Sequence, residues 1–155
     1  MKKLIILVFT LLQAACVTLH NPIPEDYVGE RASISDSYSN KESTTAHFFM
    51  VDEIDGKKIE DSWGATRLAN DGRGFYFKPK IVSREVMAKE QTFTIQGMVF
   101  FPTDAQALFL DDMAVTEQVR FSPAPGEKYT VRGKLSAQGS EVWLEDASGN
   151  KVPRN

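Results

Sequence analysis

The chain has 155 residues, of which 42% are hydrophobic and 25% are charged, and its net charge at pH 7 is −3. These values are typical of one globular domain and argue against wholesale disorder. Such mild acidity lacks the basic excess that suits nucleic-acid binding, so we expect no nucleic-acid partner.

The first fifteen residues have the parts of an export signal peptide. Lys2 and Lys3 supply the positive start, and residues 4–12 form an apolar run. That run is too short to span a hydrocarbon core about 30 Å thick, which needs about 20 apolar residues. We therefore predict a signal peptide over residues 1–15. Without its two lysines, the mature chain carries a net charge near −5 instead of −3.

Cys16 is the only cysteine of the chain, so it cannot form an internal disulfide. The segment Gln13-Ala14-Ala15-Cys16 resembles the lipobox of bacterial lipoproteins, with Gln13 in place of the usual leucine. The resemblance implies lipidation of Cys16 by three acyl chains, which hold a membrane far more firmly than one. It also implies sorting to the outer membrane, because Val17 rather than an aspartate follows the cysteine. The alternative is an incidental cysteine of the signal region.

Residues 16–26 are predicted to form a lipidated tether ahead of a single β-sandwich domain over residues 27–155. Pro22 and Pro24 disfavour both a helix and a central strand here. His20 lies in the same stretch without partners at metal-ligand spacing, so we expect no metal site.

Alternation of apolar and polar residues predicts a series of short strands in the domain. In chain order they cover residues 27–34, 46–54, 57–63, 75–82, 91–101, 115–121, 128–135 and 141–145. Residues 64–68 are expected either to continue the third of these strands or to cross to another.

The predicted connections are polar or rich in glycine. Residues 35–45 are expected to form a loop, and residues 70–74 a turn with two glycines. Asp55-Gly56 predicts a type I′ hairpin turn, because both residues tolerate a positive φ. Pro79 cannot donate to a β-ladder, which predicts an edge position or a bulge for its strand.

One short helix interrupts the strands. Thr103 and Gln106 fit a capping box, which predicts a helix over residues 105–110. The remaining pattern predicts an all-β antiparallel sandwich. The proline–glycine turn at residues 125–126, followed by an alternating strand, resembles immunoglobulin-like and transthyretin-like sandwiches.

No catalytic motif of a nucleophile elbow, a zinc protease or a phosphate-binding loop occurs in the sequence. The acidic residues between positions 52 and 61 lack the spacing of a calcium loop. His47 has no partner placed by a motif and is interpreted as a structural histidine. We therefore predict a protein that is not an enzyme, with no catalytic, cofactor-binding or metal-binding residues.

Three side chains are candidates for contact with a ligand or partner. Arg73 and Tyr76 belong to a stretch in which basic and aromatic residues alternate, although phenylalanines facing inward and lysines facing outward would give the same pattern. Trp143 shares its predicted strand face with Glu141 and Glu145, and an exposed tryptophan beside carboxylates suits sugar stacking or partner contact.

The mature region also resembles uncharacterised small exported β-domain proteins and lipoproteins of Gram-negative bacteria. The residues that carry this likeness are Tyr27-Val28-Gly29, Asp36-Ser37, Val51-x-x-Ile54-Asp55-Gly56-Lys57, Asn70-x-Gly72-Arg73-Gly74-Phe75, Pro125-Gly126-x-x-Tyr129-x-Val131-x-Gly133 and Val142-Trp143-Leu144-Glu145-Asp146. The resemblance implies a secreted β domain and transfers no catalytic residue.

Together these features predict a non-enzymatic outer-membrane lipoprotein whose domain faces the periplasm and binds or scaffolds. Its expected partners are the membrane, through Cys16, and an envelope protein or glycan. A glycan- or peptidoglycan-binding sandwich that uses Trp143, Tyr76 and Arg73 is the first alternative. An enzyme of unrecognised type, which would need a carboxylate beside His47, is the second.

Overall fold

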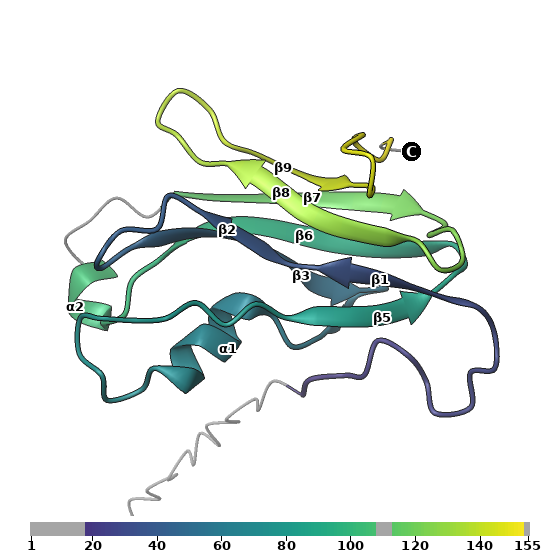
Figure 1. The fold of residues 1–155 in the computed structure, drawn as a ribbon, viewed down its shortest axis with the longest axis horizontal. Coiled ribbons are helices and arrows are strands. Elements are labelled where there is room, and N and C mark those ends of the chain that lie inside the picture. The colour runs from purple at the N-terminus through teal and green to yellow at the C-terminus, as the bar shows by residue number, and fades with distance from the viewer. Residues whose placement is uncertain (1–17, 108–112, 154–155) are drawn as a thin grey trace, which may run out of the picture.

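The computed structural model describes residues 18–107 and 113–153, and within these ranges the protein is mostly β, with nine strands and two helices. The strands form two sheets that pack against each other (Figure 1). This arrangement is consistent with the all-β sandwich that the alternating pattern predicts.

The first sheet has four strands and mixes parallel with antiparallel pairing. Its order is β5 (Ser83–Met87), β1 (Arg31–Ser35), β8 (Lys128–Lys134) and β9 (Glu141–Glu145). The β1–β8 pair is parallel, and the two other pairs are antiparallel.

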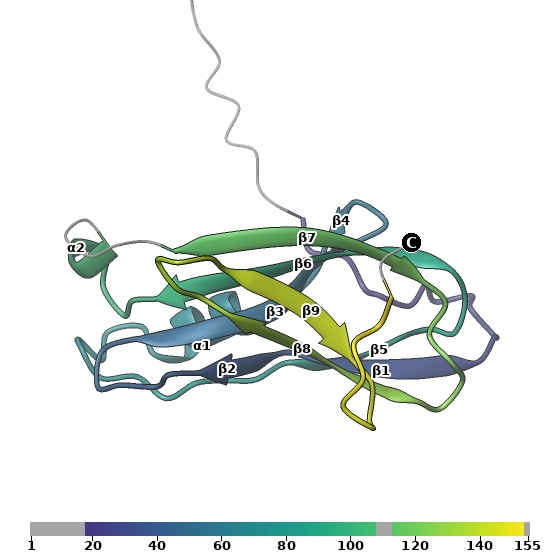
Figure 2. The same ribbon diagram turned by 90° about the horizontal axis from the view of Figure 1, so that it is seen from above.

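The second sheet has five strands, all paired antiparallel. Its main path is β2 (Ser37–Ser39), β3 (Ala46–Ile54), β6 (Gln91–Phe100) and β7 (Ala114–Phe121), with β4 (Lys57–Lys58) paired to the end of β3. The register of β3 against β6 shifts between Val51 and Glu53, as it does at a β-bulge. Figure 2 shows the two layers from above.

The main core lies between the sheets. Alternate residues of both sheets point into it, and the fully buried ones include Ile34, Val51, Ile95, Val131 and Leu144. This is the inward alternation expected of a sandwich, in which each sheet hides one face from water.

A second, smaller core lies on the other face of β3 and β6. Phe48 and Phe100 from these strands meet Phe77, and the Phe77 and Phe100 ring centroids are 4.6 Å apart. Trp63 of helix α1 (Ser62–Ala69) packs its edge on Phe100. Both faces of β3 are therefore buried, which explains its nearly continuous apolar sequence.

Five of the predicted strands are confirmed within a residue at each end. They are β3, β6, β7, β8 and β9. The hairpin turn is confirmed too, because Asp55 and Gly56 have φ values of 51° and 73°. The strand expected over residues 27–34 starts only at Arg31 and continues to Ser35.

The strand predicted over residues 57–63 is confirmed only at Lys57–Lys58, where β4 pairs antiparallel with β3. The rest of it and the extension considered for 64–68 are wrong, because α1 begins at Ser62. The Asp61 carboxylate accepts a hydrogen bond of 2.7 Å from the Gly64 amide and caps the helix. This cap supplies a partner for one of the free amides of the first turn, which outweighs the weak helix propensity of Trp63 and Gly64.

Two further predictions in this half of the chain are corrected. Residues 75–82 are not a strand; the chain becomes a strand, β5, only at Ser83, beyond Pro79. The loop predicted over residues 35–45 contains strand β2.

The second helix, α2 (Asp104–Ala107), begins where the capping box predicts. The Thr103 hydroxyl lies 3.2 Å from the Gln106 side-chain oxygen, and the Gln106 amide donates to the Thr103 carbonyl. The rest of the predicted helix, residues 108–110, lies outside the described residues.

Residues 18–30, called here the N-terminal segment, lie against the sandwich. The His20 amide donates to the Lys58 carbonyl at 2.8 Å, and Ile23 is buried. The described part of the predicted tether is therefore attached to the domain surface.

Candidate functional site

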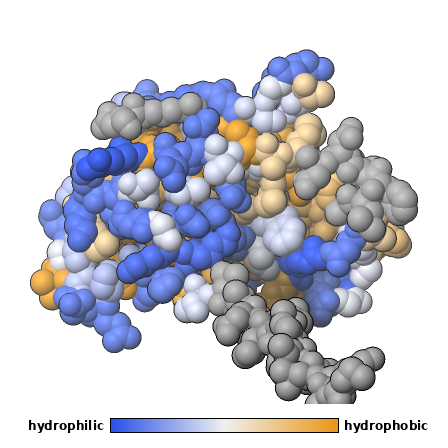
Figure 3. Space-filling view, turned by 180° about the vertical axis from the view of Figure 1, so that it is seen from behind, coloured by the Kyte–Doolittle hydropathy of each residue, from blue (hydrophilic) through white to orange (hydrophobic). Residues whose placement is uncertain are grey.

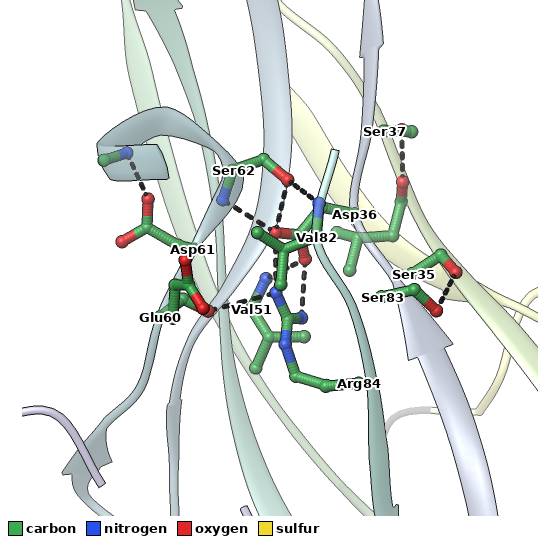
Figure 4. A network of polar contacts seen from close by, with 12 residues as sticks. Ser35, Asp36, Ser37, Val51, Glu60, Asp61, Ser62, Val82, Ser83 and Arg84 are labelled. Atoms are coloured by element: carbon green, nitrogen blue, oxygen red, sulfur yellow. Dashed lines mark hydrogen bonds and ion pairs between the residues drawn. The ribbon is translucent and has the colours of Figure 1, made fainter. Parts of the chain in front are cut away.

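The most highly charged cluster inside the sandwich surrounds Asp36, which is 2% exposed. Asp36 lies between β1 and β2, at the position where the chain passes from the first sheet to the second. The position brings its carboxylate close to groups from both sheets and from α1 (Figure 4).

The Asp36 carboxylate accepts five hydrogen bonds. Arg84 on β5 donates two of them, at 2.6 and 2.7 Å, in a bidentate pair. The amide of Val51 on β3 donates a third at 3.1 Å. Ser62 at the start of α1 donates two more, from its amide at 2.9 Å and its hydroxyl at 2.8 Å. One carboxylate thus joins both sheets and the helix.

The groups around Asp36 are themselves paired. The Ser62 hydroxyl accepts the Val82 amide at 2.7 Å, and the Arg84 guanidinium also donates to the Glu60 carbonyl at 3.2 Å. Ser62 is fully buried, and its hydroxyl both donates to Asp36 and accepts from Val82, so it is not open to a substrate. The cluster is a closed structural network, in which loss of one charge is costly.

Asp61 lies beside this network at the start of α1. Burial raises the pKa of the Asp61 carboxyl, whereas the Gly64 amide and the Lys58 ammonium oppose the shift. Its Oδ1 is occupied by the helix cap, so the carboxylate has a structural role.

Residues 68–82, called here the aromatic segment, form a different kind of surface. They contain no helix beyond Ala69 and no strand, yet the side chains of Thr66 in α1 and of Asn70, which caps α1, hold their backbone. Asn70 accepts the Lys78 amide at 3.0 Å and donates to the Lys78 carbonyl at 3.0 Å. Thr66 accepts the Lys80 amide at 2.8 Å. The segment is therefore fixed to the helix without being part of a sheet.

Three consecutive aromatic residues of this segment have different environments. Phe77 is buried in the smaller core, and the Lys41 ammonium lies 4.1 Å from its ring centroid. Phe75 is 58% exposed and Tyr76 is 75% exposed. Phe77 anchors the segment, and its two neighbours are displayed to solvent.

A hollow of about 490 Å³ adjoins the aromatic segment. Its lining includes Arg67, Asn70, Gly74, Phe100 and Asp104. Arg67 forms an ion pair with Asp104, which neutralises the strongest charges there. The titratable side chains of its described lining are Arg67, Asp71 and Asp104, and Asp104 is already paired with Arg67.

The structure does not bring the three predicted contact residues together. Arg73 and Tyr76 are both exposed on the aromatic segment. Trp143 lies on β9, which Figure 1 shows at the opposite side of the molecule. Its indole nitrogen donates to Glu145 at 3.3 Å, and the Lys151 ammonium lies 3.9 Å from its ring centroid. A ligand must compete with Lys151 for the face of this ring.

His47 contacts an amide rather than a carboxylate. The Asn40 side-chain nitrogen lies 3.2 Å from His47 Nδ1, so the amide donates and the ring nitrogen accepts. Burial lowers the pKa of His47, and the nearby Glu42 charge opposes that shift. Across the described residues, no hydrogen bond joins His47 to a carboxylate, and no group of three or more potential metal ligands occurs.

Cys16 lies outside the described residues, so its environment is not part of the site. Within residues 18–107 and 113–153, no helix is long and apolar enough to cross a membrane.

Sequence reasoning missed the Asp36 cluster. Asp36 is surrounded by serines, and that composition indicates a solvated loop. Its partners Val51, Ser62 and Arg84 are far away in sequence and belong to no motif. The only detectable signal was the Asp61–Gly64 spacing of a helix cap, which would have placed Ser62 at a helix start.

No known protein family, curated protein or solved structure matches this chain significantly.

Proposed function

We propose that this protein is a non-enzymatic lipoprotein of the outer membrane, anchored through Cys16, whose sandwich faces the periplasm as a binding or scaffolding module. The binding role is supported by the aromatic segment, in which Phe75 and Tyr76 are exposed on a backbone held by Asn70 and Thr66. Exposed aromatic side chains on a fixed backbone lose little conformational freedom on binding.

Anchoring adds to such a surface. A lipid at Cys16 would restrict the sandwich to a thin layer beside the membrane and raise its effective concentration toward envelope components. A weak contact made by a few exposed side chains is then sufficient for function.

The finer fold assignment is part of the same proposal. We infer an immunoglobulin-like or transthyretin-like sandwich, supported by two packed sheets with mainly antiparallel pairing. The parallel β1–β8 pair and helix α1, which lies between β4 and β5, are additions to that arrangement.

The anchor is tested by processing in Gram-negative cells. Globomycin, or the Cys16→Ala substitution, should leave an unprocessed precursor in the inner membrane. Release of a normally processed soluble form from the Cys16→Ala variant would contradict the lipoprotein assignment.

The contact surface is tested by photo-crosslinking in intact cells. Benzoylphenylalanine at Tyr76 should give adducts with an envelope component, whether protein, lipid or glycan. The same group at Tyr38, an exposed aromatic residue on β2, is the matched control and should give few. Equal adduct yields at both positions would argue against a binding role for the aromatic segment.

Glycan binding is a second candidate, because Tyr76 and Arg73 are exposed close together in sequence. Retention on peptidoglycan and outer polysaccharide columns should then fall in Tyr76→Ala. Unchanged retention of Tyr76→Ala and Trp143→Ala would exclude it.

A further inference from the structure

The exposed large hydrophobic side chains are concentrated on two segments. Among the described residues they number seven, and six lie on the N-terminal segment or the aromatic segment. These six are Leu19, Val28, Leu68, Phe75, Tyr76 and Ile81. The seventh is Tyr38 on β2. Exposed apolar residues scattered singly need no explanation, but a concentration of this kind marks an interaction surface.

The two segments approach each other near the start of β5, where Leu19 and Val82 line the same hollow. In Figure 1 the N-terminal segment lies at the lower right and the loop that follows α1 at the lower left. Figure 3 shows the face behind Figure 1, where hydrophilic residues predominate and hydrophobic ones are most evident toward the half that carries α2. We call the side formed by residues 18–30 and 68–82 the lower surface.

The charge of the aromatic segment differs from that of the rest of the chain. Residues 68–82 contain three basic residues and one acidic residue, a net charge of +2, whereas residues 18–30 contain three acidic residues and no lysine or arginine. Arg73, Lys78 and Lys80 are exposed, and no ion pair is found for them among the described residues. An acidic protein thus displays a local cationic stretch beside its exposed aromatic residues.

The proposed anchor lies at the same side. Thr18, the first residue of the N-terminal segment, follows Cys16 by only two residues. A chain spans at most about 3.6 Å per residue, so a lipid on Cys16 would keep Thr18 close to the bilayer. The lower surface would then face the lipid headgroups.

We propose that the aromatic segment, one part of the lower surface, docks on an anionic lipid bilayer, with Phe75 and Tyr76 at the level of the headgroups and Arg73, Lys78 and Lys80 against lipid phosphates. Aromatic residues favour the membrane interface, and lysines and arginines are attracted to anionic headgroups. The proposal rests on the proposed function, because it names the partner of the same aromatic segment. The aromatic segment would then contact the same membrane that holds the lipid on Cys16.

The test separates docking from anchoring. The mature chain from residue 16, with Cys16→Ser, keeps every residue that the structure describes but carries no lipid. Its binding is measured by co-sedimentation with vesicles of phosphatidylglycerol and phosphatidylethanolamine, and with vesicles of phosphatidylcholine alone. We expect binding to the anionic vesicles at least about tenfold tighter than to the neutral ones, and a loss in 1 M salt, where the Debye length falls to about 3 Å.

Two matched pairs of variants locate the contact. Lys78→Glu combined with Lys80→Glu should weaken anionic-vesicle binding at least about tenfold, whereas Lys128→Glu combined with Lys134→Glu, at two exposed lysines of β8, should leave it within about twofold. Phe75→Ser combined with Tyr76→Ser should also weaken it, and Tyr38→Ser should not. Circular dichroism of each variant excludes unfolding as the cause.

Several results would overturn the proposal. They are absence of binding to anionic vesicles, equal binding to both lipid compositions, or equal effects of the test and control variants. Retention of the unlipidated chain on envelope polysaccharide but not on vesicles would assign the surface to an anionic glycan instead. A failure of Cys16 processing with intact vesicle binding would reject the anchor and leave the docking surface standing.

Discussion

The Asp36 cluster and the aromatic segment contain the most distinctive side chains of the molecule, but in opposite settings. Around Asp36 the carboxylate, the Arg84 guanidinium and the Ser62 hydroxyl are buried and paired with one another. On the aromatic segment the backbone is held, while Phe75 and Tyr76 remain without cover. A buried and fully paired cluster contributes to stability and specificity of the fold, whereas exposed apolar side chains on a fixed backbone are available for contact.

The first prediction concerns the buried Asp36 cluster. Asp36→Ala leaves the Arg84 guanidinium buried without its counter-charge, so we expect a loss of about 3–5 kcal/mol in the free energy of unfolding. Urea denaturation followed by circular dichroism measures it. The control is Glu85→Ala, which removes the exposed pair with Arg31 and should cost at most about 1 kcal/mol. A cost for Asp36→Ala no larger than the control would refute a structural role.

The second prediction compares a buried and an exposed aromatic residue of the aromatic segment. Phe77→Ala removes a ring from the smaller core and should cost about 3 kcal/mol or more. Phe75→Ala, two residues earlier but exposed, should change stability by less than about 0.5 kcal/mol. Thermal or urea unfolding of the two variants measures the difference, and similar losses would mean that Phe75 is also packed.

The third prediction concerns what holds the exposed residues in place. Asn70→Ala removes the side chain that pairs with the Lys78 amide and carbonyl, and we expect a loss of about 1–2 kcal/mol. Hydrogen exchange of the Lys78 amide should accelerate more than that of amides in β6. Unchanged protection at Lys78 would show that the Asn70 contacts do not fix the segment.

The smallest expected effect is a pH dependence at Asp61. Burial raises the pKa of this carboxyl above its ordinary value of 3.8, so the folded state holds the proton more firmly than the unfolded chain. The contribution of Asp61 to stability is therefore present below pH 3.8 and declines as pH rises through the folded-state pKa.

Asp61→Asn keeps the cap acceptor for the Gly64 amide and should abolish that decline. Asp61→Ala also loses the cap and should cost about 1 kcal/mol. Unfolding free energies measured between pH 3 and pH 7 distinguish the three proteins. An identical pH profile for wild type and Asp61→Asn would contradict the raised pKa.

The sequence was most informative where one face of a strand is buried. Strands β7, β8 and β9 alternate between buried and more exposed positions, and their bounds follow from that alternation. The prediction failed at residues 62–69 and 75–82. Phe75-Tyr76-Phe77 has the composition of a strand, but Asn70 and Thr66 take the hydrogen bonds that a neighbouring strand would make.

Of the candidate site, the exposed Tyr76 and Arg73 were predicted, and the order of burial within the aromatic triplet was not. Phe77 is inside because α1 and the outer face of β3 create a second core, which no local pattern reveals. The Asp36 cluster depends on contacts across 15 to 48 residues of sequence, and such contacts have no local signature.

Those long separations have a consequence for the order of folding. The Asp36 cluster is complete only when β1, β5 and β3 are near their final places, since Arg84 of β5 and Val51 of β3 both donate to Asp36. Contacts of this range are costly in chain entropy and tend to form late. We expect Asp36 to have a low φ-value, so that its replacement accelerates unfolding far more than it slows folding. The cluster would then slow the unfolding of the sandwich more than it speeds its folding.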